Sequence, residues 1–326
     1  MGAGGVRVGA TRKTDAKIEL EKAINLAREV DQVVICAGLN VSVPAHSSEL
    51  VYYFRFELSN NLYQSDFESE GYDRPHMDLP LGSDELISAV TAANPNTVVV
   101  IQSGTPVTMS PWVASTPALI QAWYGGNETG NAIADVLFGD VNPSAKLPLS
   151  FPTRNEDNPA FLNYRSERGR TIYGEDVYIG YRYYEKTKKE VNFPFGHGLS
   201  YSEFEMSGLQ VSDKGDDEIV VEVDVKNKGK LEGAQVVQVY ISQNSPSIAR
   251  PVKELKGFTK VVLMAGEKKK AKVKLSKKYA ASFWDEMKEA WIMEKDRYEV
   301  LVGDSSANTP LKGAFTVETT SWWNGL

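Results

Sequence analysis

The sequence predicts an α/β domain with a mainly parallel sheet, followed by an all-β sandwich. Up to about residue 150, segments with helical periodicity alternate with short apolar runs. This alternation is typical of a parallel sheet that is covered by helices. From about residue 201, apolar and polar residues alternate one by one, as in antiparallel strands. The 326 residues are enough for two domains, each with a core of its own.

The elements of the first part follow from apolar spacing and helix-start signals. Ser83, with Asp84 and Glu85 behind it, is expected to cap a helix that runs to Ala93. Cys36 lies inside an apolar run, so we expect a buried thiol. The expected helices span 14–30, 83–93 and 129–138, and the expected strands span 33–37, 97–102 and 118–123.

The second part is predicted to form a β-sandwich of about 120 residues. Between the two parts lies a stretch rich in proline and tyrosine, without helical or strand periodicity, which we interpret as an ordered connector. The predicted domains are therefore 1–150, a connector at 151–200, and 201–326. The expected strands of the sandwich include 219–225, 236–241, 271–275 and 298–302.

Composition argues against several classes of function. The net charge of −7 does not favour nucleic acid, and no apolar run approaches the roughly 20 residues of a membrane helix. The three histidines are dispersed and neither an HExxH nor a GxSxG motif occurs, so we expect no metal, no cofactor and no serine triad. The start lacks a secretory signal, which favours a cytoplasmic location unless an upstream signal directs secretion.

The segment 68–80 holds the residues best suited to catalysis. Glu68 and Glu70 are two residues apart, Gly71 provides flexibility, and Asp73 is followed by Arg74. Such a loop suits positioned proton transfer at a sugar, because a general acid needs a carboxyl group held in place. From spacing alone, the alternative is a pair of solvated loop carboxylates.

This loop resembles the acid/base loop of glycoside hydrolase family 3, which includes the β-glucosidases. The resemblance implies an α/β sandwich domain followed by a fibronectin type III-like domain. It implies that Glu70, directly before Gly71, is the general acid/base of a retaining mechanism, with Glu68, Asp73 and Arg74 as possible support. Further segments that resemble the family are 121–132, 139–144, 146–148 and 193–201.

The same resemblance implies that part of the active site lies elsewhere. In the family, an aspartate nucleophile comes from an N-terminal (β/α)8 barrel, and this sequence has no room for such a barrel. The resemblance also implies that the parallel sheet of this chain can lack the first strand of the family's sheet. We therefore expect no nucleophile in this chain, low or no activity of the chain alone, and a barrel in cis or on a partner chain. The implied substrates are β-glucosides or oligosaccharides with a terminal non-reducing β-D-glucosyl residue.

The sequence also allows other interpretations of the function. Sugar preference is set largely on the barrel, so a β-xylosidase or another exo-glycosidase is an alternative. From a different class, the chain could be a noncatalytic carbohydrate-binding or scaffold protein. Oligomeric state is not indicated. Ala145 stands where the family usually has glycine. This is a mild change unless the backbone at this position requires positive φ.

Residues 41–64 interrupt what otherwise resembles a continuous strand and loop of the family. Our hypothesis is a retained intron, because valine codons begin with GT and a glutamine codon can end in AG. A genuine insertion that gates the substrate is the alternative. Sequencing the spliced transcript distinguishes the two, since a message that retains the segment excludes the intron.

Overall fold

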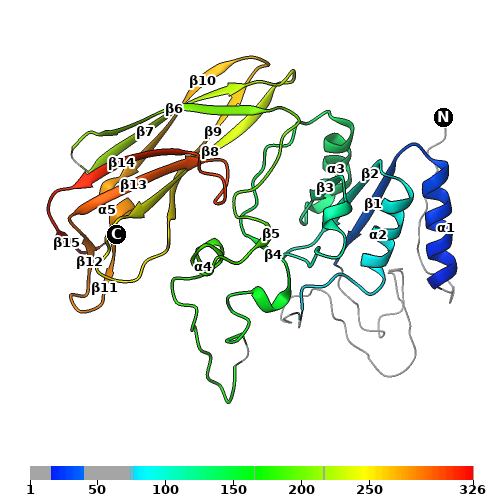
Figure 1. Ribbon diagram of the computed structural model, residues 1–326, viewed down its shortest axis with the longest axis horizontal. Coiled ribbons are helices and arrows are strands. Elements are labelled where there is room, and N and C mark those ends of the chain that lie inside the picture. The colour runs from blue at the N-terminus through cyan, green and yellow to red at the C-terminus, as the bar shows by residue number, and fades with distance from the viewer. Residues whose placement is uncertain (1–15, 40–73, 75, 165, 216, 326) are drawn as a thin grey trace. The chain divides into compact units, whose positions relative to one another are not determined.

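The structure is a computed structural model that describes residues 16–39, 74, 76–164, 166–215 and 217–325 (Figure 1). Its internal contacts divide the chain into two units. The first is Met1–Ile133 with Pro152–Glu156, and the second is Ala134–Phe151 with Asp157–Leu326. A parallel sheet with helices is followed by antiparallel strands, so the predicted fold class is confirmed. The domain boundaries at residues 150 and 200 stay a prediction.

The first unit contains a parallel sheet with the strand order β1-β2-β3. Helices α1 and α2 pack against each other, as Figure 1 shows. The strands are β1 (Val33–Gly38), β2 (Thr97–Gln102) and β3 (Ala118–Gln121), and the helices are α1 (Ala16–Glu29) and α2 (Ser83–Ala93), with the 3-10 turns η1 (Val113–Ser115) and η2 (Gly126–Glu128). The division between the two units falls within α3 (Thr129–Phe138) and within the 3-10 turn η3 (Asn155–Asp157).

The middle strand β2 carries the core of this sheet, because three successive residues, Val99, Val100 and Ile101, are fully buried. A strand with both faces covered reads as a continuous apolar run. In β1 only Ile35 is buried and Cys36 is exposed. The expectation of a buried thiol is therefore wrong, because β1 is the outer strand among those described and its side chains alternate in burial.

The start of α2 also differs from the expectation. Gly82, in the left-handed conformation at φ 87°, is the N-cap, and no side chain caps the helix. Ser83 is the first helical residue, and its N–H donates to the carbonyl of Pro80 at 3.0 Å. The Asp84 carboxylate accepts a hydrogen bond of 2.8 Å from Nε1 of the buried Trp112. The capping role predicted for Ser83 is wrong because a glycine turn starts the helix.

Asn94, which is buried just after α2, ties the two helices together. Its Nδ2 donates to the carbonyls of Ala27 and Val30 at 2.9 and 2.8 Å. The last carbonyls of a helix lack partners within that helix. The Asn94 side chain supplies such partners at the end of α1, while its own carbonyl accepts a hydrogen bond from Thr97 Oγ1 at 2.6 Å.

In the second unit the connector is more regular than the sequence predicts. It contains α4 (Tyr181–Thr187) and β5 (Val191–Phe193), which forms a two-stranded sheet with β4 (Phe151–Pro152). Ion pairs hold α4 against the start of β9 (Glu254–Leu263): Arg182 with Glu254 at 3.2 Å, and Glu185 with Lys253 at 2.7 Å. A short helix fixed by such contacts needs no apolar periodicity.

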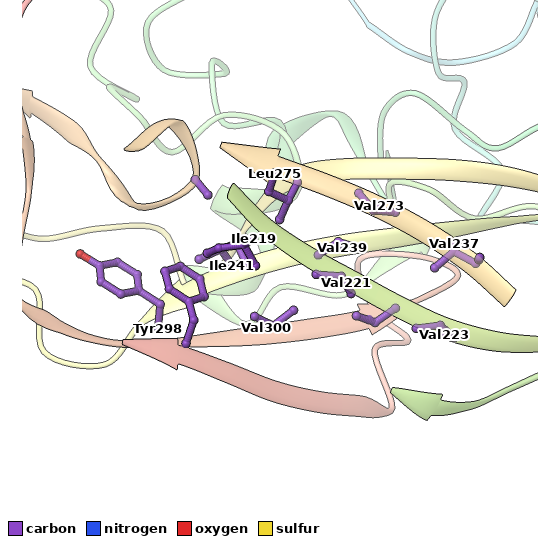
Figure 2. Close-up of a cluster of buried hydrophobic side chains, with 14 of the residues drawn as sticks. Ile219, Val221, Val223, Val237, Val239, Ile241, Val273, Leu275, Tyr298 and Val300 are labelled. Atoms are coloured by element: carbon purple, nitrogen blue, oxygen red, sulfur yellow. The ribbon is translucent and has the colours of Figure 1, made fainter. Parts of the chain in front are cut away.

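The sandwich consists of a three-stranded sheet, β10-β7-β6, and a four-stranded sheet, β14-β13-β8-β9, both antiparallel. Figure 2 shows side chains of both sheets directed into one interior, among them Val221, Val239 and Tyr298. A third small sheet has the order β11-β12-β15. The bounds are β6 (Phe204–Asp213), β7 (Glu218–Asn227), β8 (Gly233–Gln243), β9 (Glu254–Leu263), β10 (Lys268–Ser276), α5 (Lys277–Ala281), β11 (Phe283–Asp285), β12 (Ala290–Met293), β13 (Asp296–Gly303), β14 (Leu311–Val317) and β15 (Ser321–Trp323).

A buried amide joins the connector to this sandwich. Gln238, on β8 and 3% exposed, donates from Nε2 to the carbonyls of Gly196 at 3.0 Å and Asp304 at 2.5 Å. Its Oε1 accepts the Tyr240 hydroxyl at 2.6 Å. Gly196 has φ +80°, and a Cβ there would lie 2.2 Å from Gln238 Oε1. The position therefore requires glycine for both its backbone and its neighbour.

We expect Asn94→Ala to lower the free energy of unfolding by about 1–3 kcal/mol, because buried carbonyls of α1 lose their donor. Chemical denaturation measures the loss. Asn25→Ala is the matched control, since Asn25 is exposed on α1 and its side chain accepts only an exposed bond from Arg28 in the described residues. Equal stability of both variants would contradict the role assigned to Asn94.

Gly196→Ala should destabilise the protein more than Gly266→Ala. Gly266 has a similar φ of +75° with nothing within 4 Å of a built Cβ, so its variant reports backbone strain alone, about 1–2 kcal/mol. The additional loss at Gly196, expected to be about 1–3 kcal/mol, reports the broken Gln238 hydrogen bonds. Thermal unfolding of both variants tests this, and matching losses would show that the Gln238 contact contributes nothing.

Candidate functional site

The candidate site lies at the carboxyl ends of the parallel strands, where α/β sheets commonly bind ligands. At this edge β1 and β2 approach closely. A Cβ on Gly38 would lie 2.0 Å from the carbonyl oxygen of Gln102, so no other residue fits there. The next residue, Leu39, donates its backbone N–H to the same carbonyl at 2.9 Å. The chain that leaves β1 is therefore fixed at the end of β2.

Arg74 fixes the chain a second time at this end of β2. Its Nη2 donates to Thr105 Oγ1 at 2.7 Å and to the carbonyl of Pro106 at 2.9 Å. Both acceptors belong to the loop that follows β2. A guanidinium group provides several donors in a rigid plane, so one side chain can hold two acceptors at once.

Of the residues predicted for the site, the structure describes Arg74. Glu68, Glu70 and Asp73 lie outside the described residues, as do 41–64. The described flanks of this segment, Leu39 and Arg74, are both bonded at the end of β2. Sequence reasoning did not identify Thr105 and Pro106. Their position directly after an apolar strand of a parallel sheet was the available signal.

Trp123 differs from its expected place at the end of a buried strand. Strand β3 ends at Gln121, and Trp123 follows with φ 55°. A bulky residue at positive φ is a genuine conformational outlier, and such outliers cluster at functional sites. The next residue, Tyr124, donates its hydroxyl to the carbonyl of Leu39 at 3.4 Å. The end of β3 is thus joined to the chain that leaves β1.

Ser103 has a structural role at the same edge. It is fully buried, and its hydroxyl donates to the carbonyl of Thr105 at 2.8 Å. Gln121 Nε2 donates to Ser103 Oγ at 3.1 Å. These bonds shape the loop that holds Arg74, and they occupy the hydroxyl that a serine hydrolase would need as its nucleophile.

Three of the segments that resemble the family, 139–144, 146–148 and 193–201, contact one another within the second unit. Asn142 Oδ1 accepts hydrogen bonds from Ser200 Oγ and from the backbone N–H of Tyr201, both at 2.8 Å. Lys146 Nζ donates to the carbonyl of Gly198 at 2.6 Å. Ala145 is not among the described residues with positive φ, so it can replace glycine without backbone strain. These segments organise the fold.

His197, in the segment 193–201, is suited to packing. Burial lowers the pKa of its imidazole, and the ammonium group of Lys146 lowers it further. Its ring lies 5.3 Å from that of Phe193. A neutral, partly buried imidazole fits a structural position.

Within the described ranges, no three His, Cys, Asp or Glu residues are placed to hold a metal ion. No helix among these residues is both long and apolar enough to cross a membrane.

Comparisons with known proteins identify two regions. Residues 6–201 match the glycosyl hydrolase family 3 C-terminal domain, and residues 235–306 match the fibronectin type III-like domain. A probable β-glucosidase I of Aspergillus fumigatus is 51% identical over 333 aligned residues. That match covers 100% of this chain and 37% of the relative, so the chain spans little more than a third of the relative's length.

Among solved structures, β-glucosidases are also similar to this chain. A β-glucosidase from Kluyveromyces marxianus, crystallised with glucose, is 48% identical with a TM-score of 0.85, covering 97% of this chain and 35% of that one. A family 3 β-glucosidase from Bifidobacterium adolescentis is 34% identical with a TM-score of 0.81, covering 95% and 42%. The expected resemblance is confirmed, and the chain belongs to the glycosyl hydrolase family 3 C-terminal domain family, with a fibronectin type III-like domain in its C-terminal part.

Proposed function

We propose that this chain supplies the acid/base side of a retaining, exo-acting β-glucosidase. The observation that carries the proposal is the anchoring of Leu39 and Arg74 at the end of β2. Leu39 and Arg74, which flank the segment that contains Glu70, are thus both bonded at the edge of a parallel sheet, where ligands commonly bind. The relatives named β-glucosidase support the substrate class.

In this role Glu70 acts twice. It protonates the glycosidic oxygen while the bond to the anomeric carbon breaks and a nucleophilic carboxylate forms a glycosyl-enzyme. It then takes a proton from the water that attacks this intermediate. The nucleophile must come within about 5–5.5 Å of Glu70. We propose that it belongs to protein outside this sequence, which covers 37% of the Aspergillus fumigatus relative.

Arg74 is proposed as a positioning residue, with Glu68 and Asp73 as further support for the loop. Its two hydrogen bonds fix the chain four residues beyond Glu70. A misplacement of about 1 Å can cost about a hundredfold in rate, so this distant anchor matters to the chemistry.

The decisive experiment joins this chain to the part of the Kluyveromyces marxianus β-glucosidase that precedes the matched segment. Glu70→Ala should lower turnover of 4-nitrophenyl β-D-glucoside by about 10²–10⁴-fold, because general acid–base catalysis is lost. Added azide should restore turnover of a dinitrophenyl glucoside, since this leaving group needs no acid and azide needs no base. Such rescue identifies an acid/base residue rather than a structural one.

Glu68→Ala is the matched control and should retain most of the activity. Equal activity of the Glu70→Ala and unchanged fusions, or loss only in Glu68→Ala, would overturn the assignment. In the full-length protein, faster hydrolysis of 4-nitrophenyl β-D-xyloside than of the glucoside would favour a β-xylosidase. A folded fusion that binds glucose and hydrolyses neither substrate would favour a noncatalytic binding protein.

In the same fusion, Arg74→Lys should lower kcat/KM for the glucoside by about tenfold and leave the melting temperature almost unchanged. Lysine keeps the charge and loses the planar pair of donors. Thr105→Val removes one acceptor and should have a smaller effect in the same direction. Arg297→Lys, on β13 of the sandwich, serves as control. An unchanged kcat/KM in Arg74→Lys would exclude the anchor.

A further inference from the structure

The small third sheet contains an unusual concentration of tryptophan. Of six tryptophans in the sequence, Trp284, Trp291, Trp322 and Trp323 lie in β11, β12 and β15. The buried cluster that fills the sandwich includes none of these four. Their rings are therefore not explained by the need for a core, and large exposed aromatic side chains often mark a binding surface.

The strand register places three of these side chains in one row. Trp284 pairs with Trp291, and Trp291 pairs with Trp323. Residues that are directly opposite in antiparallel strands point to the same face of the sheet. Trp322 pairs with Ile292 and therefore belongs to the opposite face, on which Ile292 and Ala290 are buried.

The rings of the row form a continuous strip with Tyr279. The ring centroids of Tyr279 and Trp323 are 5.1 Å apart in an edge-to-face contact, and those of Trp291 and Trp284 are 5.7 Å apart in another. Trp323 and Trp291 are stacked between them, with centroids 5.6 Å apart. The two ends of the strip are the most accessible, since Tyr279 and Trp284 are each 46% exposed.

The strip is held in place before any ligand arrives. Trp323 Nε1 donates to Ser282 Oγ at 3.0 Å, which fixes the orientation of its ring. The Lys278 ammonium lies 5.0 Å from the centre of the same ring. A rigid aromatic surface loses little conformational entropy on binding, which favours affinity.

We propose that this aromatic strip, formed by Tyr279, Trp323, Trp291 and Trp284, binds a β-linked glucose oligosaccharide. The C–H face of a pyranose ring packs on an aromatic face by dispersion and by attraction to the π electrons. The two exposed end rings, Tyr279 and Trp284, contact separate sugar units, and the stacked Trp291 and Trp323 lie between them, so an oligosaccharide binds more tightly than glucose. The choice of β-linked glucose rests on the proposed function, whereas the aromatic strip itself does not.

The charges around the strip fit an uncharged ligand. The turn beside Trp284 carries the exposed Glu286, Lys288 and Glu289, and Lys278 lies at the other end. Opposite signs alternate and nearly cancel, which gives no field to attract a strongly charged partner. The same groups can exchange hydrogen bonds with sugar hydroxyls.

The experiment is a titration of the chain with cellotetraose, followed by calorimetry and tryptophan fluorescence. Trp284→Ala and Tyr279→Ala should each weaken binding by about tenfold, equivalent to about 1.4 kcal/mol. Trp322→Ala is the matched control, because Trp322 is 49% exposed on the opposite face of the same sheet. It should bind within about twofold of the unchanged chain, and glucose should bind more weakly than cellotetraose.

The readout is binding without turnover, so it separates this proposal from the proposed catalysis. The proposal is overturned if cellotetraose gives no saturable signal at millimolar concentration, or if Trp322→Ala weakens binding as much as Trp284→Ala. Concentration-dependent self-association that Trp284→Ala abolishes, without cellotetraose binding, would assign the strip to a second copy of the chain instead. Melting temperatures confirm that each variant is folded.

Discussion

The close approach of β1 and β2 at Gly38 is the constraint on which the candidate site depends. Gln102 leaves no space for a side chain at this position, and its carbonyl then receives the N–H of Leu39. Arg74 binds the loop that follows Gln102, so the chain leaves and returns at one strand end. Proton transfer needs a carboxyl group in a fixed place. Here the sheet edge, rather than the loop sequence alone, supplies the two fixed points.

The first unit was largely predictable because its elements follow local periodicity, as the buried run of β2 shows. Predictions for single residues were wrong where neighbouring elements determine the local structure. Cys36 is exposed because β1 is an outer strand, and Gly82 rather than Ser83 is the N-cap of α2. In the sandwich, β6 escaped notice because Gly208, at φ +62°, lies where its register shifts and interrupts the alternation of apolar residues. The acid/base role proposed for Glu70 rests on family resemblance, while the contact of Arg74 with Thr105 required three-dimensional information.

The second unit shows that sequence motifs and chemistry are carried by different parts of the chain. Asn142 and Lys146 bind the segment around Gly198, and Gln238 binds Gly196 beside it. All of these contacts build the scaffold. Loops attached to such rigid scaffolds commonly carry function. The segments 139–144, 146–148 and 193–201, which resemble the family, are therefore distinct from the residues proposed to react or to bind sugar.

Leu39 and Arg74, the two residues anchored at the end of β2, also bear on the conformational entropy that a longer intervening segment costs. The entropic cost of joining two fixed points grows only with the logarithm of the number of residues between them. Lengthening residues 40–73 from 10 to 34 residues, the difference made by 41–64, adds about 1 kcal/mol. The stability of the fold therefore sets only a weak limit on the length of this segment.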